Sequence, residues 1–281
     1  MNKKLSNGVM MPMFGLGTFR VAPGESAYET VKHALSVGYR HIDTAQMYGN
    51  EESVGDALVD SNIPRNEIFI TTKQLIHSTV ENMQKYFDES LRKLKTDYID
   101  LFLIHWPNHN KEINRQTWAF FESLYEQKKV RAIGVSNFQR HHLMDLMETC
   151  KIKPMIDQVE LHPGLNQIPL KGYLDSVDIA IGSYGPFMKG GIFEGGFGEE
   201  LQKIANKHQA TITQVVIAWG LNRDIIMIPK SVTPSRILEN YQGQFLKLNK
   251  EDIETINQLN RGKRVYTDPD NNSWSEYKIK L

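Results

Sequence analysis

IFITTKQLIHSTVENMQKYFDESLRKLKTDYIDLFLIH, residues 68–105, contains the pattern that decides the fold. The apolar runs at 68–72 and 98–104 have the length of buried strands, and the stretch at 79–93 between them has the apolar spacing of an amphipathic helix. Strands that alternate with helices in this way are typical of βα units around a parallel sheet. The stretch therefore predicts an α/β protein.

The same alternation continues in both directions along the chain. Further strands are expected at 14–16, 40–44, 130–135, 155–159, 179–183 and 225–228. Helices are expected near 25–37, 51–60, 113–128, 139–149, 169–175 and 199–222, the last broken around Ala210, and an eighth follows Pro234. Residues 250–259 predict an extra C-terminal helix. Eight βα units fit a closed (β/α)8 TIM barrel, so we expect one domain over residues 1–281.

The start of the chain carries a hairpin signal and an incomplete glycine motif. Asn7-Gly8 lies between short runs at 4–5 and 10–11, which is typical of a β-hairpin turn and predicts a plug for the N-terminal end of the barrel. The alternative fold is a doubly wound dinucleotide-binding sheet. Its Gly-x-Gly-x-x-Gly fingerprint begins at Gly15 and Gly17, but Arg20 stands where the third glycine should be.

Charge and hydropathy exclude several classes of partner. The chain has 33 basic and 33 acidic residues, and no basic cluster is interleaved with aromatic residues, so we expect no nucleic-acid partner. No run approaches the roughly 18 apolar residues of a membrane span, and the basic start lacks the apolar stretch of a signal peptide. We therefore expect a cytoplasmic protein without membrane contact. We also expect a monomer, because no long apolar surface stripe demands a partner.

Four reactive side chains, Asp43, Tyr48, Lys73 and His105, fall at or just beyond the ends of three expected strands. In a TIM barrel the catalytic residues come from the C-terminal ends of strands and the loops after them. Each of the four has an ordinary structural explanation when taken alone. Their joint occurrence at successive strand ends favours a catalytic site.

These four groups suit the reduction of a carbonyl. Tyr48 can donate the proton that the oxygen takes up, and we expect the nearby Lys73 ammonium to lower the pKa of the phenol. Asp43 would keep Lys73 charged and in place, and His105 would hold the substrate oxygen. None of the four can supply hydride, so a nicotinamide cofactor is implied.

A phosphate site is expected in the second half of the chain. Thr233 suits the N-cap of the last barrel helix and Pro234 its first position, which leaves free amides for an anion, with the hydroxyl of Ser231 nearby. Lys230 and Arg236 beside this helix start favour the 2′-phosphate of NADP over the ribose of NAD.

The nicotinamide end of the cofactor is expected on three other strands. Ser136, Asn137 and Gln158 offer hydroxyl and amide groups for its carboxamide, and the ring of Tyr184 can stack on it. The glycine-rich run at 190–198 permits close backbone approach and leads into a helix, consistent with a cover over the pyrophosphate.

With these motifs in place the chain resembles the aldo-keto reductase superfamily, in particular its small bacterial-type members. The resemblance rests on Gly15-Leu16-Gly17-Thr18, His41-Ile42-Asp43-Thr44-Ala45, Ile104-His105-Trp106-Pro107, Gly134-Val135-Ser136-Asn137-Phe138, Asp157-Gln158-Val159-Glu160, Lys230-Ser231 and Arg236-Ile237-Leu238-Glu239-Asn240. It implies a TIM barrel that binds NADPH without a Rossmann domain and reduces aldehydes, ketones, dicarbonyls or keto sugars to alcohols.

The resemblance also assigns roles to individual residues, with no metal among them. Its catalytic tetrad falls on Asp43, Tyr48, Lys73 and His105. Its substrate pocket falls on Phe19, Tyr48, His105 and Trp106. Its cofactor contacts fall on Gly17, Thr18, Asp43, Ser136, Asn137, Gln158, Tyr184, Lys230, Ser231, Val232, Thr233, Arg236, Glu239 and Asn240.

Two segments depart from the family pattern. Gln74-Leu75 stands where many members have Leu-Trp, and Tyr184-Gly185-Pro186-Phe187 stands where Tyr-Ser-Pro-Leu is frequent. The first departure removes an aromatic wall from the expected pocket, and the second removes a hydroxyl. Trp274 in the short tail is a further candidate for substrate contact, with loose surface packing as the equal alternative.

Two other functions use the same residues. His41, Asp43 and His105 suggest a metal-dependent hydrolase, but no His-x-His pair occurs on one strand and Lys73 would repel a cation. A non-catalytic nicotinamide-binding redox sensor is the second alternative, and the intact tetrad argues against it.

Overall fold

Eight parallel strands form the centre of the molecule in a computed structural model that describes residues 1–75 and 79–272. Their order in the sheet follows the chain, so each strand pairs with the one before it. The strands are β3 (Leu16–Gly17), β4 (His41–Asp43), β5 (Phe69–Lys73), β6 (Ile99–Ile104), β7 (Val130–Ser136), β8 (Ile156–Glu160), β9 (Ala180–Tyr184) and β10 (Ile226–Ile228).

The sheet closes on itself between its first and last strands. The Met227 amide of β10 donates to the Met13 carbonyl at 2.8 Å, and the Gly15 amide donates to the Met227 carbonyl at 3.0 Å. Backbone hydrogen bonds therefore join the two ends, and the predicted (β/α)8 TIM barrel is confirmed. The first strand was expected at 14–16, but β3 begins only at Leu16, because residues 13–15 pair with β10 before the ladder to β4 starts.

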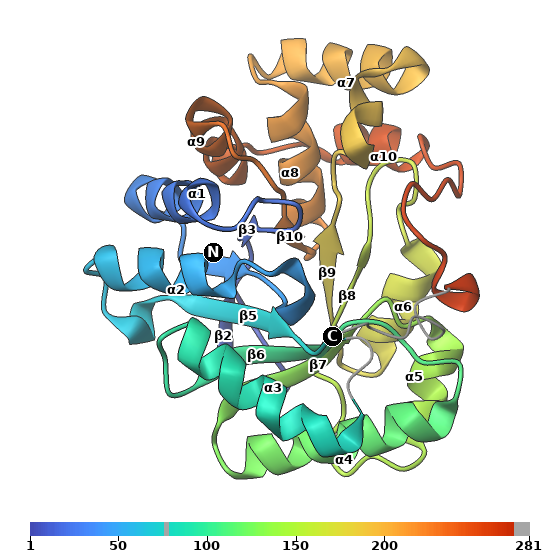
Figure 1. The fold of residues 1–281 in the computed structure, drawn as a ribbon. Helices are drawn as coiled ribbons and strands as arrows, with labels where there is room; N and C mark the ends of the chain where they lie inside the picture. The colour runs from blue at the N-terminus through green and yellow to red at the C-terminus, as the bar shows by residue number, and fades with distance from the viewer. Residues whose placement is uncertain (76–78, 273–281) are drawn as a thin grey trace.

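Helices surround the strands (Figure 1). They are α1 (Glu25–Val37), α2 (Glu51–Asp60), α3 (Val80–Lys93), α4 (Lys111–Glu126), α5 (Arg140–Met147), α6 (Ile168–Ser176), α7 (Gly195–Lys207), α8 (Ile212–Asn222), α9 (Pro234–Gln242) and the extra C-terminal α10 (Lys250–Asn257). The apolar faces of the barrel helices pack on the strands. Phe121 of α4, for example, stacks on Phe102 of β6 with ring centroids 4.4 Å apart.

Local capping explains where two helices differ from the expected bounds. α4 begins at Lys111 rather than 113, because the Asn110 side chain accepts a hydrogen bond from the Glu112 amide at 3.0 Å. The break near Ala210 is confirmed, since Thr211 and Gln214 form a capping box that starts α8. α7 begins at Gly195, so the second half of the glycine-rich run is helical rather than loop.

The predicted N-terminal hairpin is confirmed. β1 (Asn2–Lys4) pairs antiparallel with β2 (Met10–Pro12), and Gly8 in the turn has φ 89°. The Met11 side chain is fully buried, and the Asn7 side-chain amide donates to the Arg131 carbonyl near the start of β7 at 2.9 Å. The hairpin thus lies at the N-terminal ends of the strands, opposite the expected site. In the described part of the chain, no helix has the length and apolar character needed to cross a bilayer.

Candidate active site

The four predicted catalytic side chains meet at the C-terminal ends of neighbouring strands. Asp43 ends β4 and Lys73 ends β5, while His105 follows β6 directly. Tyr48 ends a short 3-10 helix, Gln46–Tyr48, which follows β4. Neighbouring parallel strands end at the same edge of the barrel, and this brings the four groups together.

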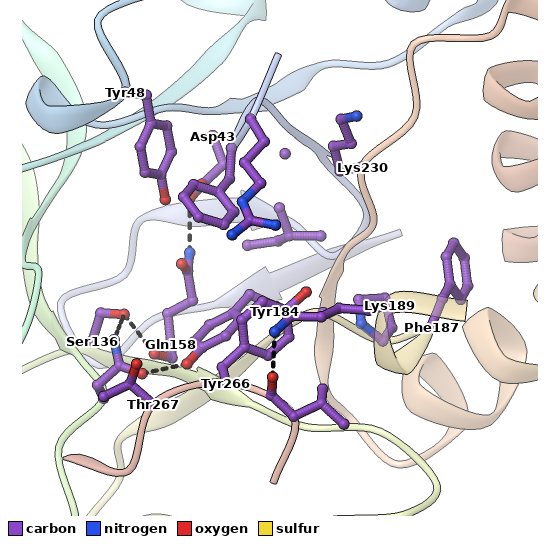
Figure 2. Close-up of a pocket in the computed structure, with 18 of the residues that line it drawn as sticks. Asp43, Tyr48, Ser136, Gln158, Tyr184, Phe187, Lys189, Lys230, Tyr266 and Thr267 are labelled. Carbon is purple, nitrogen blue, oxygen red and sulfur yellow. Dashed lines mark hydrogen bonds between the residues drawn. The ribbon is translucent and has the colours of Figure 1, made fainter. Parts of the chain in front are cut away.

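Asp43 and Lys73 form a buried ion pair at the base of the site. The ammonium also donates to the Thr44 carbonyl at 3.0 Å and to the Tyr48 hydroxyl at 3.4 Å. The second carboxylate oxygen of Asp43 accepts from the side-chain amide of Gln158 at 2.7 Å (Figure 2). The contacts with Asp43 and Thr44 therefore hold the Lys73 ammonium beside the phenol.

The electrostatics of Tyr48 differ from the sequence-based expectation. Although part of its ring lines the cavity, desolvation raises the pKa of Tyr48 well above 10, and the Asp43 charge raises it further. Lys73 does not reverse this direction, because its charge is already paired with Asp43 and burial lowers its own pKa. The expected lowering of the Tyr48 pKa was therefore wrong. The phenol consequently stays protonated at neutral pH.

His105 is a neutral imidazole in this setting. Burial lowers its pKa well below 6.5, and the nearby Lys73 charge lowers it further. Its ring packs edge-on against Tyr48 with centroids 5.6 Å apart. A neutral imidazole beside the phenol can donate one hydrogen bond, and its lowered pKa makes it a poor acceptor for the proton of Tyr48.

The residues expected at the nicotinamide end form one hydrogen-bonded wall. The Tyr184 hydroxyl donates to the Asn137 side-chain oxygen at 2.6 Å, and the Asn137 amide donates to the His105 carbonyl at 3.0 Å. The Ser136 hydroxyl donates to the Gln158 carbonyl at 2.7 Å. This network links Tyr184 at the end of β9 to His105 directly after β6, so the two residues hold a fixed spacing.

A cavity of about 900 Å³ connects the tetrad to the expected phosphate site. In the view of Figure 2, Tyr48 and Lys230 lie on opposite sides of the residues drawn. Twelve predicted residues line the cavity: Gly17, Phe19, Asp43, Tyr48, His105, Trp106, Ser136, Asn137, Gln158, Tyr184, Lys230 and Arg236. This volume is at the upper end of ligand pockets, about 300–1,000 Å³, and suits a long ligand.

The start of α9 offers cations, and its N-cap residue is Thr233 as predicted. Pro234 occupies the first helical position as expected, whereas the Thr233 side chain makes no capping hydrogen bond. Instead the Ser231 hydroxyl accepts from the Thr233 amide at 3.2 Å. Lys230 and Arg236 are exposed and line the cavity. An anion at this part of the cavity would meet two positively charged side chains.

The remaining predicted contacts lie outside the described lining of the cavity. The hydroxyl of the fully buried Thr18 donates a hydrogen bond to the Asp43 carbonyl at 3.0 Å and so stabilises the end of β4. Glu239 accepts from the Thr211 hydroxyl at 2.8 Å, which ties α9 to α8, while Asn240 is buried and Val232 is exposed. At the Gln74-Leu75 departure, Gln74 is buried and the Leu75 amide donates to the Gln46 side chain at 2.6 Å. Trp274 lies outside the described residues.

Several lining residues were not found from the sequence. Tyr266 packs edge-on against Tyr184 with ring centroids 5.3 Å apart, and it fills the space beside Gly185. Its segment has no strand or helix periodicity, so no sequence pattern marked it. Arg20 could have been noticed in the sequence, because it is a single positive charge next to the Gly15-x-Gly17 motif. The missed residues are Arg20, Met47, Lys189, Phe193, Ile228, Val265, Tyr266 and Thr267.

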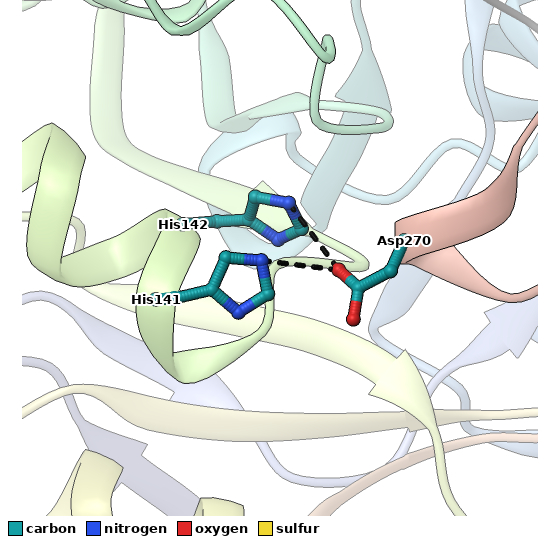
Figure 3. Close-up of side chains that lie close together, drawn as sticks. All are labelled: His141, His142 and Asp270. Atoms are coloured by element: carbon teal, nitrogen blue, oxygen red, sulfur yellow. Dashed lines mark ion pairs between the residues drawn. The ribbon is translucent and has the colours of Figure 1, made fainter.

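His41, Asp43 and His105, the ligands suggested for a metal-dependent hydrolase, do not converge as a group in the described part of the chain. His41 is fully buried and its Nε2 lies 3.0 Å from the Thr71 hydroxyl. Within residues 1–75 and 79–272, one group of potential metal ligands converges, and it comprises His141, His142 and Asp270 outside the cavity (Figure 3).

That group also fits a metal poorly. The Gln139 amide donates to Nδ1 of His142 at 3.1 Å, which leaves the ring proton on Nε2, the nitrogen that faces Asp270 at 3.5 Å. A ligating histidine normally donates from its other nitrogen, and here that nitrogen is an acceptor. The three side chains instead join the C-terminal segment to α5.

Comparison with known proteins agrees with this geometry. A profile of the Aldo/keto reductase family matches residues 13–261. The chain belongs to this family. Glyoxal reductase of Bacillus subtilis is 44% identical to this aldo/keto reductase over 268 residues, covering 95% of each chain. Methylglyoxal reductase DkgA of Yersinia pestis is 42% identical over 268 residues, with the same coverage.

A solved relative of this aldo/keto reductase contains a cofactor. The crystal structure of a Gox0644 mutant in complex with NADPH superposes with a TM-score of 0.90 at 36% identity, covering 97% of this chain and 98% of that one. The lining described above fits such a group, because a tyrosine ring, side-chain amides and two cations line the same cavity.

Proposed function

We propose that this aldo/keto reductase uses NADPH to reduce small aldehydes and dicarbonyls of the glyoxal and methylglyoxal type, with Tyr48 as the proton donor. The observation that carries the proposal is the Tyr48 hydroxyl, which lies 3.4 Å from a buried lysine that is ion-paired with Asp43. The two relatives named for glyoxal and methylglyoxal suggest the substrate class.

Proton transfer follows from the protonation states of the tetrad. The raised pKa of Tyr48 keeps its hydroxyl protonated, so the phenol is available as a donor at neutral pH. As negative charge develops on the substrate oxygen, the proton passes from Tyr48 to that oxygen. The Lys73 ammonium then stabilises the phenolate that remains, because it already lies within reach of this oxygen.

The other two members of the tetrad hold this arrangement. Asp43 balances the charge of Lys73 and is itself fixed by Gln158. Neutral His105 orients the carbonyl by a hydrogen bond and leaves the donation to Tyr48. Phe19 packs on Tyr48 with ring centroids 5.2 Å apart and, with Trp106, supplies apolar walls for a small substrate.

Cofactor residues are assigned by their position in the cavity. When bound, NADPH supplies the hydride for the carbonyl carbon. Tyr184, Ser136, Asn137 and Gln158 would hold its nicotinamide, and Lys230 and Arg236 would hold its 2′-phosphate. The cavity volume of about 900 Å³ and the two cations in its lining support this assignment.

A carbonyl panel tests the proposed reaction. The purified protein is mixed with NADPH and with glyoxal, methylglyoxal, simple aldehydes and keto sugars, and nicotinamide absorbance is followed. We expect the highest kcat/KM for the two small dicarbonyls and a lower rate with NADH. Tight NADPH binding without turnover of any carbonyl would contradict the proposal and favour the redox-sensor alternative.

A further inference from the structure

Residues 264–272, here called the strap, follow α10 and form part of the wall of the active-site cavity. Figure 1 shows them in red, running from α10 toward α5. The Tyr266 ring packs edge-on against Tyr184 and lies 4.4 Å from the Lys189 ammonium. The strap residues that line the cavity are Val265, Tyr266 and Thr267. A shift of the strap would therefore change the shape of the cavity.

The near end of the strap is fixed by a buried carboxylate. Glu160, the last residue of β8, is fully buried, and its side chain accepts a hydrogen bond from the Val265 amide at 2.6 Å. Its other oxygen lies 3.7 Å from the Arg264 guanidinium. A hydrogen bond to a charged group that is shielded from water is costly to break. The near end is thus a fixed point for the rest of the strap.

The far end is held by imidazoles close to the surface. Asp270 lies in the short helical turn η5 (Pro269–Asn271). Its Oδ1 is 3.1 Å from Nε2 of His141 and 3.5 Å from Nε2 of His142, both on α5 (Figure 3). The side chains of His141 and Asp270 are 63% and 52% exposed. Water competes for such contacts, so this end is easier to release than the near end.

The other contacts of the far end are mostly polar too. The Asn272 carbonyl lies 2.8 Å from Nε2 of His109, in the loop between β6 and α4. A cavity of about 430 Å³ separates this loop from Asp270, and its described lining is entirely polar. Pro269 is the one apolar residue of η5 and is buried. The far end consequently depends on hydrogen bonds and ion pairs more than on core packing.

This difference between the two ends makes the strap a wall with one fixed and one releasable end. We propose that the clamp formed by Asp270, His141 and His142 sets how closely the strap covers the cavity, and that its opening admits carbonyl substrates bulkier than methylglyoxal. The three are positioning residues, because none belongs to the described lining of the active-site cavity. They act through Tyr266 and Thr267. The inference rests on the carbonyl reduction in the proposed function, but the clamp can be measured without turnover.

Hydrogen exchange followed by mass spectrometry measures the clamp in the protein without substrate. His141→Ala removes the closer imidazole and leaves the sequence of the strap unchanged, so strap peptides can be compared directly with the wild type. The amides of Asp270 and Asn271 donate to Asp268. We expect both to exchange about fivefold faster in His141→Ala, the factor that corresponds to one net hydrogen bond.

Three comparisons control the exchange measurement. The Val265 amide should keep its wild-type rate in His141→Ala, because Glu160 still holds it. His141→Gln keeps a side-chain N–H donor and should exchange more slowly than His141→Ala. Met144→Ala changes an exposed residue of the same helix and should leave the exchange of the strap unchanged. Thermal unfolding of each variant shows that it is folded at the temperature of the experiment.

Steady-state kinetics measure the effect of the clamp on the site. Methylglyoxal and the bulkier phenylglyoxal are compared in the wild type, Asp270→Ala and Asp270→Asn. In Asp270→Ala the KM for methylglyoxal should rise about fivefold, with kcat and NADPH affinity changed by less than about twofold. The ratio of kcat/KM for phenylglyoxal to that for methylglyoxal should rise by a similar factor of about five. Asp270→Asn keeps an oxygen that can accept from both imidazoles and should restore wild-type values.

Two results would overturn the inference. One is unchanged strap exchange in His141→Ala. The other is faster exchange in that variant while Asp270→Ala keeps the KM and the substrate preference of the wild type. Failure of the proposed function is a separate result, because the wild type would then reduce no carbonyl, and hydrogen exchange would still decide whether the clamp holds the strap.

Discussion

The Tyr266 ring packs so closely against Gly185 that a side chain at position 185 would overlap the ring. Gly185 has φ +63°, and a Cβ added there would lie 2.5 Å from the Tyr266 ring. The departure from the frequent Tyr-Ser-Pro-Leu pattern therefore has a physical reason in this chain. The tail contributes an aromatic ring that needs the space a serine would fill.

Substitution at Gly185 should reveal this contact. Gly185→Ala should destabilise the protein by about 1–3 kcal/mol, since the new methyl group is strained at positive φ and overlaps the ring. Tyr266→Ala in the same chain should recover the part due to overlap. Urea unfolding of the wild type, both single variants and the double variant measures this coupling. Strictly additive changes would show that the two residues do not share this space.

The N-terminal hairpin is an element whose role is separable from catalysis. Met11 of β2 is fully buried, whereas its neighbour Met10 is 49% exposed. Because strand side chains alternate, one methionine closes the barrel and the other faces water. The hairpin lies at the opposite end of the strands from Tyr48 and Lys73.

Met11→Ala should lower the free energy of unfolding by about 2–5 kcal/mol, as expected for a large-to-small change in a core. Met10→Ala is the matched control and should change stability by less than about 0.5 kcal/mol. Both proteins should retain wild-type kcat with methylglyoxal at a temperature where they stay folded. A selective loss of kcat in Met11→Ala would mean that the plug influences the active end of the barrel.

Element boundaries show where sequence patterns stop being sufficient. Apolar periodicity predicted the strands and helices of the barrel because each element buries one face. It placed the first strand too early, since residues 13–15 pair with β10, a contact between distant parts of the chain. It also left Gly195 in a loop, although α7 starts there.

In the candidate site, too, local sequence patterns predicted some residues, whereas contacts between distant parts of the chain could not be predicted. The tetrad could be predicted because its residues follow strand ends in local motifs. Tyr266 and Lys189 could not, because their contact joins the tail to a loop that is distant in sequence. The direction of the Tyr48 pKa also required the structure, since it depends on how completely water is excluded around the phenol.

The whole molecule should lose stability in mild acid through a buried histidine. Burial lowers the pKa of His41 to about 4, against 6.5 for an unperturbed histidine. Between these values the unfolded chain binds a proton that the folded chain does not, so stability is full above about 6.5 and falls as pH drops towards about 4. The contribution is on the order of 3 kcal/mol.

Chemical denaturation between pH 4 and pH 7 measures this dependence. His41→Gln should flatten the slope relative to the wild type, whereas His33→Gln, which removes a partly exposed histidine, should leave the slope unchanged. An unchanged slope in His41→Gln would assign the acid sensitivity to other groups.

Single-turnover reduction in the Tyr48→Phe variant tests the central claim most directly. The enzyme is saturated with NADPH, mixed rapidly with methylglyoxal, and the loss of bound nicotinamide absorbance is recorded. The account predicts that the phenylalanine variant binds NADPH like the wild type but transfers hydride at least about 100-fold more slowly, because no group replaces the phenolic proton. Hydride transfer at the wild-type rate would contradict it.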